Sequence, residues 1–196
     1  MPSRELQREG AELHAVFVNP NIHPFTEWER RREGLERMAE IEGVRLLPSS
    51  DYEPVCWLRE VAFREGERCR VCYHLRLRQA ALLARRGRFD AFSSSLLYSV
   101  HQKHDLIREL GESVGSEVGV PFLYRDWRSA WRDGVTESKQ LGLYRQSYCG
   151  CLLSEQERYA GKRQKSGRAH SLGKGESARP EAPAAAKSPN DPRAPR

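Results

Sequence analysis

The sequence predicts an α/β domain in which a parallel sheet is covered by helices. Short apolar runs alternate with segments whose apolar residues recur every three or four positions, as strands alternate with helices in this class. Glycines follow several of the helical segments, where a left-handed residue commonly ends a helix. The length of 196 residues suits one domain of ordinary size and is too short for two full α/β domains.

The first half of the chain is expected to contain two strands, 13–18 and 44–48, each followed by a helix. The first helix, 26–42, begins at a threonine that can cap it and is closed by a glycine. The second helix, 51–61, begins at a capping aspartate and has a proline in its first turn, where proline is tolerated.

The second half continues the same alternation. A third helix carries Val71, Leu75 and Leu82 on one face and is closed by Gly87. The remaining expected elements are a strand at 89–97, a helix through 107–118, a short strand at 120–124, and helices at 131–141 and 152–159.

The two ends of the sequence differ from this body. Residues 4–10 predict a polar helical turn, so the chain begins like the end of a helix whose leading strand is missing. Residues 161–196 hold nine Lys or Arg against three acidic residues, which equals the net charge of +6 of the whole chain. The body, 1–160, is therefore formally neutral, and 161–196 is predicted to be a disordered basic tail.

The compartment follows from two further features. The sequence has no apolar run long enough to cross a bilayer and no apolar stretch behind its N-terminal charges, so we expect a cytoplasmic protein without a membrane partner. Thiols stay reduced in the cytosol. Paired cysteines there more often serve metals or redox chemistry than structural bridges.

Four of the five cysteines form two tight pairs. Cys69 and Cys72 are spaced C-x-x-C where the third helix begins, a position expected to lower the pKa of both thiols and to let them reach one metal or each other. Cys149 and Cys151 flank Gly150, and a disulfide across one residue would close a strained, easily reduced ring. The spacing alone supports two interpretations equally well. The second pair could be an electron relay, or both pairs together could form one Cys₄ zinc site.

The other candidates are weaker. Cys56 is expected to be buried packing, and His101 and His104 are expected in a solvated first turn of a helix rather than on a metal. The segments 19–21 and 93–95 lie near strand ends, where α/β sheets bind ligands. Both segments are equally compatible with simple capping and turn roles.

These motifs together resemble one family, the cobalamin-independent epoxyqueuosine reductases or QueH family. The resemblance runs in family order from about Arg4 to Arg158, and its most specific part is the segment ending in Cys149-Gly150-Cys151. The segments that carry it are 18–24 (VNPNIHP), 67–73 (ERCRVCY), 92–97 (FSSSLL) and 141–151 (LGLYRQSYCGC).

The resemblance implies a Rossmann-like domain, a parallel sheet with helices on both faces, acting as an oxidoreductase in tRNA modification. Such enzymes reduce the epoxide of epoxyqueuosine in the anticodon loop to the alkene with loss of water, using an external electron donor. Carried over, Cys69 and Cys72 would be ligands of a [4Fe–4S] cluster, and Cys149 and Cys151 would form a redox-active disulfide. This favours the electron relay over the zinc site.

The sequence departs from the family at its start, where the first family strand is absent, so we interpret it as an N-terminally shortened member of the family. The family cluster also uses two adjacent cysteines near the N-terminus, and no two adjacent cysteines occur here. Since a cubane cluster generally needs four thiolates, the chain as written is expected to bind little iron and to be weakly active or inactive. The alternatives are a catalytically dead family member, a zinc-stabilised RNA-binding module without catalysis, and a thiol–disulfide oxidoreductase that acts on proteins.

Overall fold

The computed structural model of the chain describes residues 2–49 and 51–160. The chain divides into two units, Met1–Tyr159 and Ala160–Arg196, and the labelled helices and strands lie in the first. The tail predicted at 161–196 lies outside the described residues. Within the described part, no helix is both long enough and apolar enough to cross a membrane.

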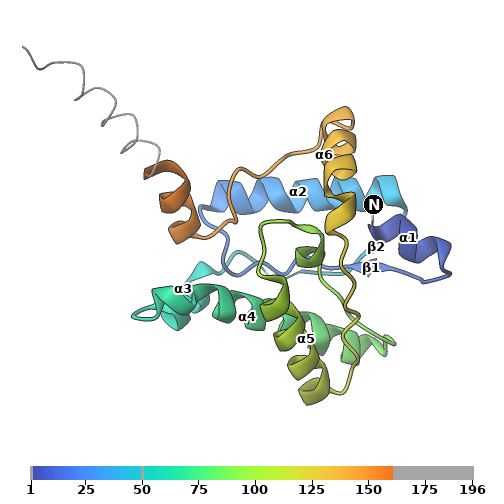
Figure 1. Cartoon of the computed structure of the whole chain (residues 1–196), viewed down its shortest axis with the longest axis horizontal. Coiled ribbons are helices and arrows are strands. Elements are labelled where there is room, and N and C mark those ends of the chain that lie inside the picture. Colours follow the sequence, from blue (N-terminus) through green and yellow to red (C-terminus); the bar gives the residue numbers. More distant parts are fainter. Residues whose placement is uncertain (1, 50, 161–196) are drawn as a thin grey trace, which may run out of the picture. The chain divides into compact units, whose positions relative to one another are not determined.

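Helices make up most of the described fold, and each helix expected from the sequence is present (Figure 1). Residues 152–159 are also helical, as expected. The bounds are α1 Pro2–Arg8, α2 Phe25–Glu42, α3 Pro54–Val61, α4 Arg68–Gly87, α5 His104–Val118 and α6 Trp131–Gln140.

Glycines end two of these helices as the sequence predicts. The predicted end at Gly87 is wrong, because Gly87 is still helical and Arg88 takes the left-handed conformation with φ +56°. Gly43 follows α2 with φ +63° and donates its N–H back to the carbonyls of the last turn. Gly119 does the same after α5 with φ +78°. Both lie in the left-handed region, which glycine adopts without steric cost.

The predicted N-terminal caps are wrong at both positions. Thr26 lies inside α2, which begins one residue earlier, after Pro24. Asp51 lies before α3, whose first turn begins at Pro54. A proline fixes φ near the helical value and lacks only an N–H that the first turn does not use, so the start of α3 follows the proline rather than the acidic residue.

The parallel pairing expected of an α/β domain is confirmed, although the strands are short. Strands β1 (His14–Ala15) and β2 (Arg45–Leu46) run parallel in the register His14 to Arg45. A single parallel bridge joins Phe92 to Phe122. In Figure 1, α2 lies on one side of the β1–β2 pair and α4 and α5 lie on the other. The continuous Rossmann-like sheet implied by the resemblance is not clearly formed by the described residues.

The strand predicted over 89–97 is shortened for a local reason. Ser94 accepts a hydrogen bond from the N–H of Leu96 through its hydroxyl, at 3.3 Å, and starts a 3₁₀ helix over Ser95–Tyr98. A serine hydroxyl that binds nearby backbone competes with strand pairing. Only Phe92 therefore pairs, and the chain then turns.

The largest apolar cluster joins α4 and α5 and includes the fully buried Leu77 and Ile107. A smaller cluster of Trp57, Val61, Cys72 and Cys151 joins α3, α4 and the segment that leads into 152–159. This second cluster brings the two cysteine motifs together, because it contains one cysteine of each.

Candidate functional site

The two cysteine pairs lie in one region of the fold. Cys69 and Cys72 lie in the first two turns of α4, while Cys149 and Cys151 lie on the loop before the helical residues 152–159. Cys72 and Cys151 are both buried in the cluster around Trp57. Burial is the main cause of the raised pKa of Cys69 and Cys72, and negative charge on Cys149 or Cys151 acts in the same direction, as expected of neighbouring motifs.

The protonation of the C-x-x-C thiols differs from the sequence prediction. Burial raises the pKa of Cys72 to about 12, with Arg76 opposing the shift. Burial also raises the pKa of Cys69, against the cations Lys103 and Arg68. The expectation that the start of a helix lowers these pKa values is wrong. Burial destabilises the thiolate by more than the nearby cations stabilise it, so the pKa rises.

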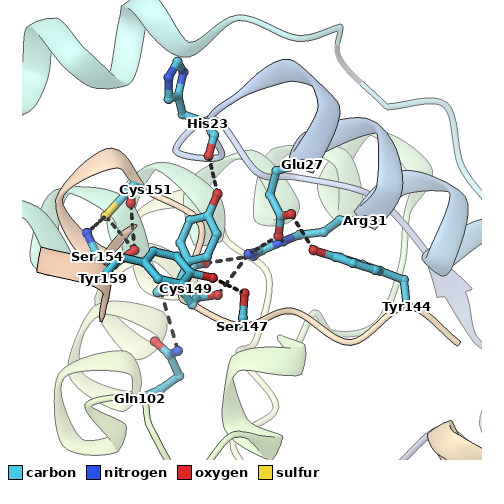
Figure 2. A network of polar contacts seen from close by, with 11 residues as sticks. His23, Glu27, Arg31, Gln102, Tyr144, Ser147, Cys149, Cys151, Ser154 and Tyr159 are labelled. Atoms are coloured by element: carbon cyan, nitrogen blue, oxygen red, sulfur yellow. Dashed lines mark hydrogen bonds and ion pairs between the residues drawn. The ribbon is translucent and has the colours of Figure 1, made fainter. Parts of the chain in front are cut away.

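The C-x-C loop is in the dithiol form, and all five cysteines of the chain are free. The half-buried Cys149 accepts a hydrogen bond at its Sγ from Nε2 of Gln102, at 3.8 Å (Figure 2). The buried Cys151 accepts one at its Sγ from the backbone N–H of Ser154 and donates to the Ser154 hydroxyl, each at 3.4 Å. The two thiols thus have different partners on different elements.

Gln102 connects the two cysteine motifs. The hydroxyl of Tyr73, the residue after Cys72, donates to Oε1 of Gln102 at 2.7 Å. This bond leaves the amide nitrogen of Gln102 facing Cys149. Burial raises the pKa of Tyr73 to about 12, so its hydroxyl remains a donor at neutral pH.

A second set of contacts holds the backbone of the C-x-C loop. Arg31 of α2 donates to the carbonyl oxygens of Tyr148 and Cys149, at 2.9 and 2.8 Å. The backbone N–H of His23 donates to the carbonyl oxygen of Gly150, at 2.8 Å. Three consecutive carbonyl groups of the loop therefore accept hydrogen bonds from residues just before or within α2.

Several other sequence candidates have structural roles or different surroundings. Cys56 is exposed, so the expectation of buried packing is wrong. His104 is 5% exposed and its Nε2 lies 3.2 Å from the carbonyl oxygen of Ser99, so the expected solvated position is wrong for this residue. His101 is exposed and packs edge-on against Trp131.

The polar segments near the strand ends are mostly structural. Ser94 caps the 3₁₀ helix, which confirms the capping interpretation for this residue. Ser93 instead donates its hydroxyl to the carbonyl oxygen of Leu123 and joins two distant segments. Asn21 is 1% exposed, and its Oδ1 has no hydrogen-bond partner within the described residues.

The described residues do not supply a full ligand set for the implied cluster. Cys69 and Cys72 offer two thiols where a [4Fe–4S] cluster generally takes four. Beside Cys72 and Cys151, the indole N–H of Trp57 is buried without a hydrogen-bond partner in the described part of the chain. Across residues 2–49 and 51–160, no three or more His, Cys, Asp or Glu side chains are grouped so as to hold a metal ion.

Sequence reasoning missed the residues that hold the cysteines. Glu27 and Arg31 have the i, i+4 spacing of an ordinary helix-surface ion pair, and this spacing was the only signal available for them. Gln102 lies in no motif, and Tyr73 closes the C-x-x-C segment without any sign of its own role. Their role depends on contacts between segments about 30 or more residues apart.

Comparison with known proteins gives one consistent family. The family model described as "Epoxyqueuosine reductase QueH" matches residues 1–157. The epoxyqueuosine reductase QueH of Dehalococcoides mccartyi is 38% identical over 153 residues, which cover 78% of this chain and 84% of the relative. The protein of the same name from Thermotoga maritima is 36% identical, over 72% of this chain and 79% of the relative. The chain therefore belongs to the QueH family of epoxyqueuosine reductases, which are oxidoreductases.

Proposed function

We propose that the chain reduces the epoxide of epoxyqueuosine in tRNA to the alkene of queuosine, in the cytoplasm and at the expense of an external electron donor. Membership of the family supports the reaction. The observation that carries the site assignment is the gathering of Cys69, Cys72, Cys149 and Cys151 in one region, although the two motifs are nearly 80 residues apart in sequence.

The C-x-C pair can account for the electrons and protons of this reaction. When the Cys149 and Cys151 thiols join as a disulfide, they release two electrons and two protons. The epoxide takes up both, its two C–O bonds break, the alkene forms, and the oxygen leaves as water. A two-electron external reductant then restores the dithiol, which is the state seen in the structure.

Cys69 and Cys72 are proposed as cluster ligands. When bound, a [4Fe–4S] cluster would supply one-electron transfer and a Lewis-acidic iron. The two thiols would lose their protons on binding iron, because the thiolate is the ligand. The electron balance given above involves only the C-x-C pair and the external reductant.

The direct test is turnover by the 196-residue chain. We expect slow formation of queuosine when the protein is incubated anaerobically with iron, sulfide, a chemical reductant and tRNA that carries epoxyqueuosine, as measured by mass spectrometry of digested nucleosides. The rate should be low because the described residues supply two of the four thiolates that the cluster generally takes. Cys149→Ser and Cys151→Ser should each lower the rate at least about 100-fold, since neither can form the disulfide, and should change tRNA affinity less than about twofold. The exposed Cys56→Ser is the matched control and should retain activity.

Two results would contradict the proposal. One is a wild-type chain that binds tRNA but leaves the epoxide intact in every reductant. The other is full activity in the Cys149 and Cys151 variants. Metal analysis after anaerobic purification separates the zinc alternative, which predicts one zinc per chain and no iron.

A further inference from the structure

Arg31 reaches from α2 to the backbone of the C-x-C loop. Its Nη1 donates to the carbonyl oxygen of Cys149 at 2.8 Å and its Nη2 to that of Tyr148 at 2.9 Å. In Figure 2 the guanidinium lies between Glu27 and the loop that carries Cys149. A planar guanidinium can bind two neighbouring acceptors at once, and bonds from a charged donor are stronger than neutral ones.

The position of Arg31 is itself fixed. Glu27, one turn earlier on α2, accepts a hydrogen bond from Nε of Arg31 at 2.7 Å, and the same carboxylate oxygen forms an ion pair with Nη2 at 2.7 Å. The Tyr144 hydroxyl donates to the other carboxylate oxygen of Glu27. The side chains of Arg31 and Glu27 are only 9% and 7% exposed. A buried ion pair whose polar atoms are satisfied has one strongly preferred geometry, because any other arrangement leaves a buried charge unpaired.

Gly150 is what allows Arg31 to come this close. A Cβ atom at residue 150 would lie 2.7 Å from Nη1 of Arg31 and 3.0 Å from Cγ1 of Ile22. The glycine also has φ +121°, a conformation that other residues rarely adopt. Gly150 therefore has two roles: it leaves room for the guanidinium of Arg31, and it adopts the backbone conformation that the turn requires.

The held loop keeps the two thiols with separate partners, Gln102 for Cys149 and Ser154 for Cys151. Closing a disulfide removes the S–H that Cys151 donates to Ser154 and brings the pair into the narrow Cβ–S–S–Cβ geometry of a bonded cystine, which is a change in the loop. Hydrogen bonds that fix the carbonyls of residues 148–150 oppose that change. We propose that Arg31 is a positioning residue that holds the C-x-C loop in its dithiol arrangement and so biases the pair toward the reduced state. This inference rests on the proposed redox role of the pair.

The equilibrium to be measured is the oxidation of the Cys149–Cys151 dithiol by glutathione disulfide. It gives the protein disulfide and two molecules of glutathione. We would equilibrate the 196-residue chain in glutathione buffers, alkylate the free thiols, and measure the peptide containing Cys149 and Cys151 by mass spectrometry. In Arg31→Gln we expect the equilibrium constant to shift about tenfold toward the disulfide, or about 30 mV for a two-electron couple.

Three further variants sharpen this test. Arg31→Lys should give an intermediate shift, since a single ammonium cannot match the fork that spans two carbonyls. Tyr144→Phe keeps the arginine but removes one bond from its counter-ion, so we expect a smaller shift in the same direction. Arg37→Gln is the matched control, an arginine on the same helix that makes none of these contacts, and should stay within twofold of the wild type.

The possible failures are distinguishable. If the wild-type pair oxidises but Arg31→Gln and Tyr144→Phe, both shown to be folded by circular dichroism, stay within twofold of it, the role of Arg31 is wrong and the redox role of the pair stands. If Arg31→Gln does not fold, the test is Tyr144→Phe alone: a shift toward the disulfide supports the role of Arg31, and a value within twofold of the wild type contradicts it. If the wild-type pair never oxidises at any glutathione ratio, both proposals are wrong.

Discussion

Gly150 illustrates how one residue serves both the turn and the site. Its φ of +121° places the backbone where a side chain is strained. The space that a side chain would need is also taken, because the atom nearest to a methyl group at this position would belong to the buried guanidinium of Arg31. Gly142, nearby on the same segment, has φ +62° but open space around it.

We therefore predict different costs for the same substitution at these two glycines. Gly150→Ala should lower the free energy of unfolding by about 3 kcal/mol or more, from backbone strain and displacement of Arg31 together. Gly142→Ala should cost about 1–2 kcal/mol, from the left-handed conformation alone. Urea denaturation of both variants measures the difference, and equal costs would show that the contact with Arg31 contributes nothing.

At the scale of elements, two glycines of α5 set how closely the helix approaches the segment after it. A methyl group on Gly115 would lie 2.8 Å from the carbonyl oxygen of Val120, and one on Gly111 would overlap the ring of Phe122. Phe122 is also the residue that pairs with Phe92. The close approach of helix and extended segment thus depends on residues without side chains.

This packing reverses the usual effect of glycine replacement in a helix. Gly34→Ala in α2 meets only an ordinary contact at 4.0 Å and should stabilise the protein by about 0.5–1 kcal/mol. Gly115→Ala should instead destabilise it by about 1–2 kcal/mol, because its methyl group meets backbone that cannot rotate away. Thermal unfolding gives the signs. If Gly115→Ala stabilised the protein instead, segment 120–122 would have to move away from the added methyl group at little energetic cost.

At the scale of the first unit, several tyrosine hydroxyls are removed from water at contacts between distant segments. The Tyr148 hydroxyl donates to the carbonyl oxygen of His23 at 2.6 Å, across more than 120 residues of sequence. Burial raises the pKa of Tyr148 to about 12, and it raises the pKa of Tyr52, Tyr98 and Tyr144 in the same direction. The folded state therefore holds these phenol protons more tightly than the unfolded state does.

Stability should consequently fall in alkali. For Tyr148 the ordinary pKa is 10 and the folded value is about 12, so its contribution is complete below pH 10 and is lost as the pH rises from 10 to 12. The urea midpoint of the wild type should decline over this interval, and that of Tyr148→Phe should decline less steeply. A parallel decline in the two proteins would show that Tyr148 titrates normally.

Much of the local structure could be predicted from the sequence. The helices α2 and α5 were expected from the spacing of residues such as Trp28 and Ile107 and from the glycines that follow them. These signals are local, because a helix forms its hydrogen bonds within itself. The strand at 89–97 was overestimated, since its pairing depends on partners elsewhere and competes with the Ser94 hydroxyl.

The site divides in the same way. The sequence by itself determined the helices, the parallel α/β class, the two cysteine motifs and, through them, the family. Only the tertiary structure decided that Cys72 and Cys151 share one apolar cluster, that burial raises rather than lowers the pKa of Cys69 and Cys72, and that Glu27 and Arg31 are a buried pair holding the C-x-C loop. Motifs and helix periods depend on neighbours in the chain. Burial and the partners of a charge depend on segments that meet only when the chain folds, and no spacing along the sequence encodes them directly.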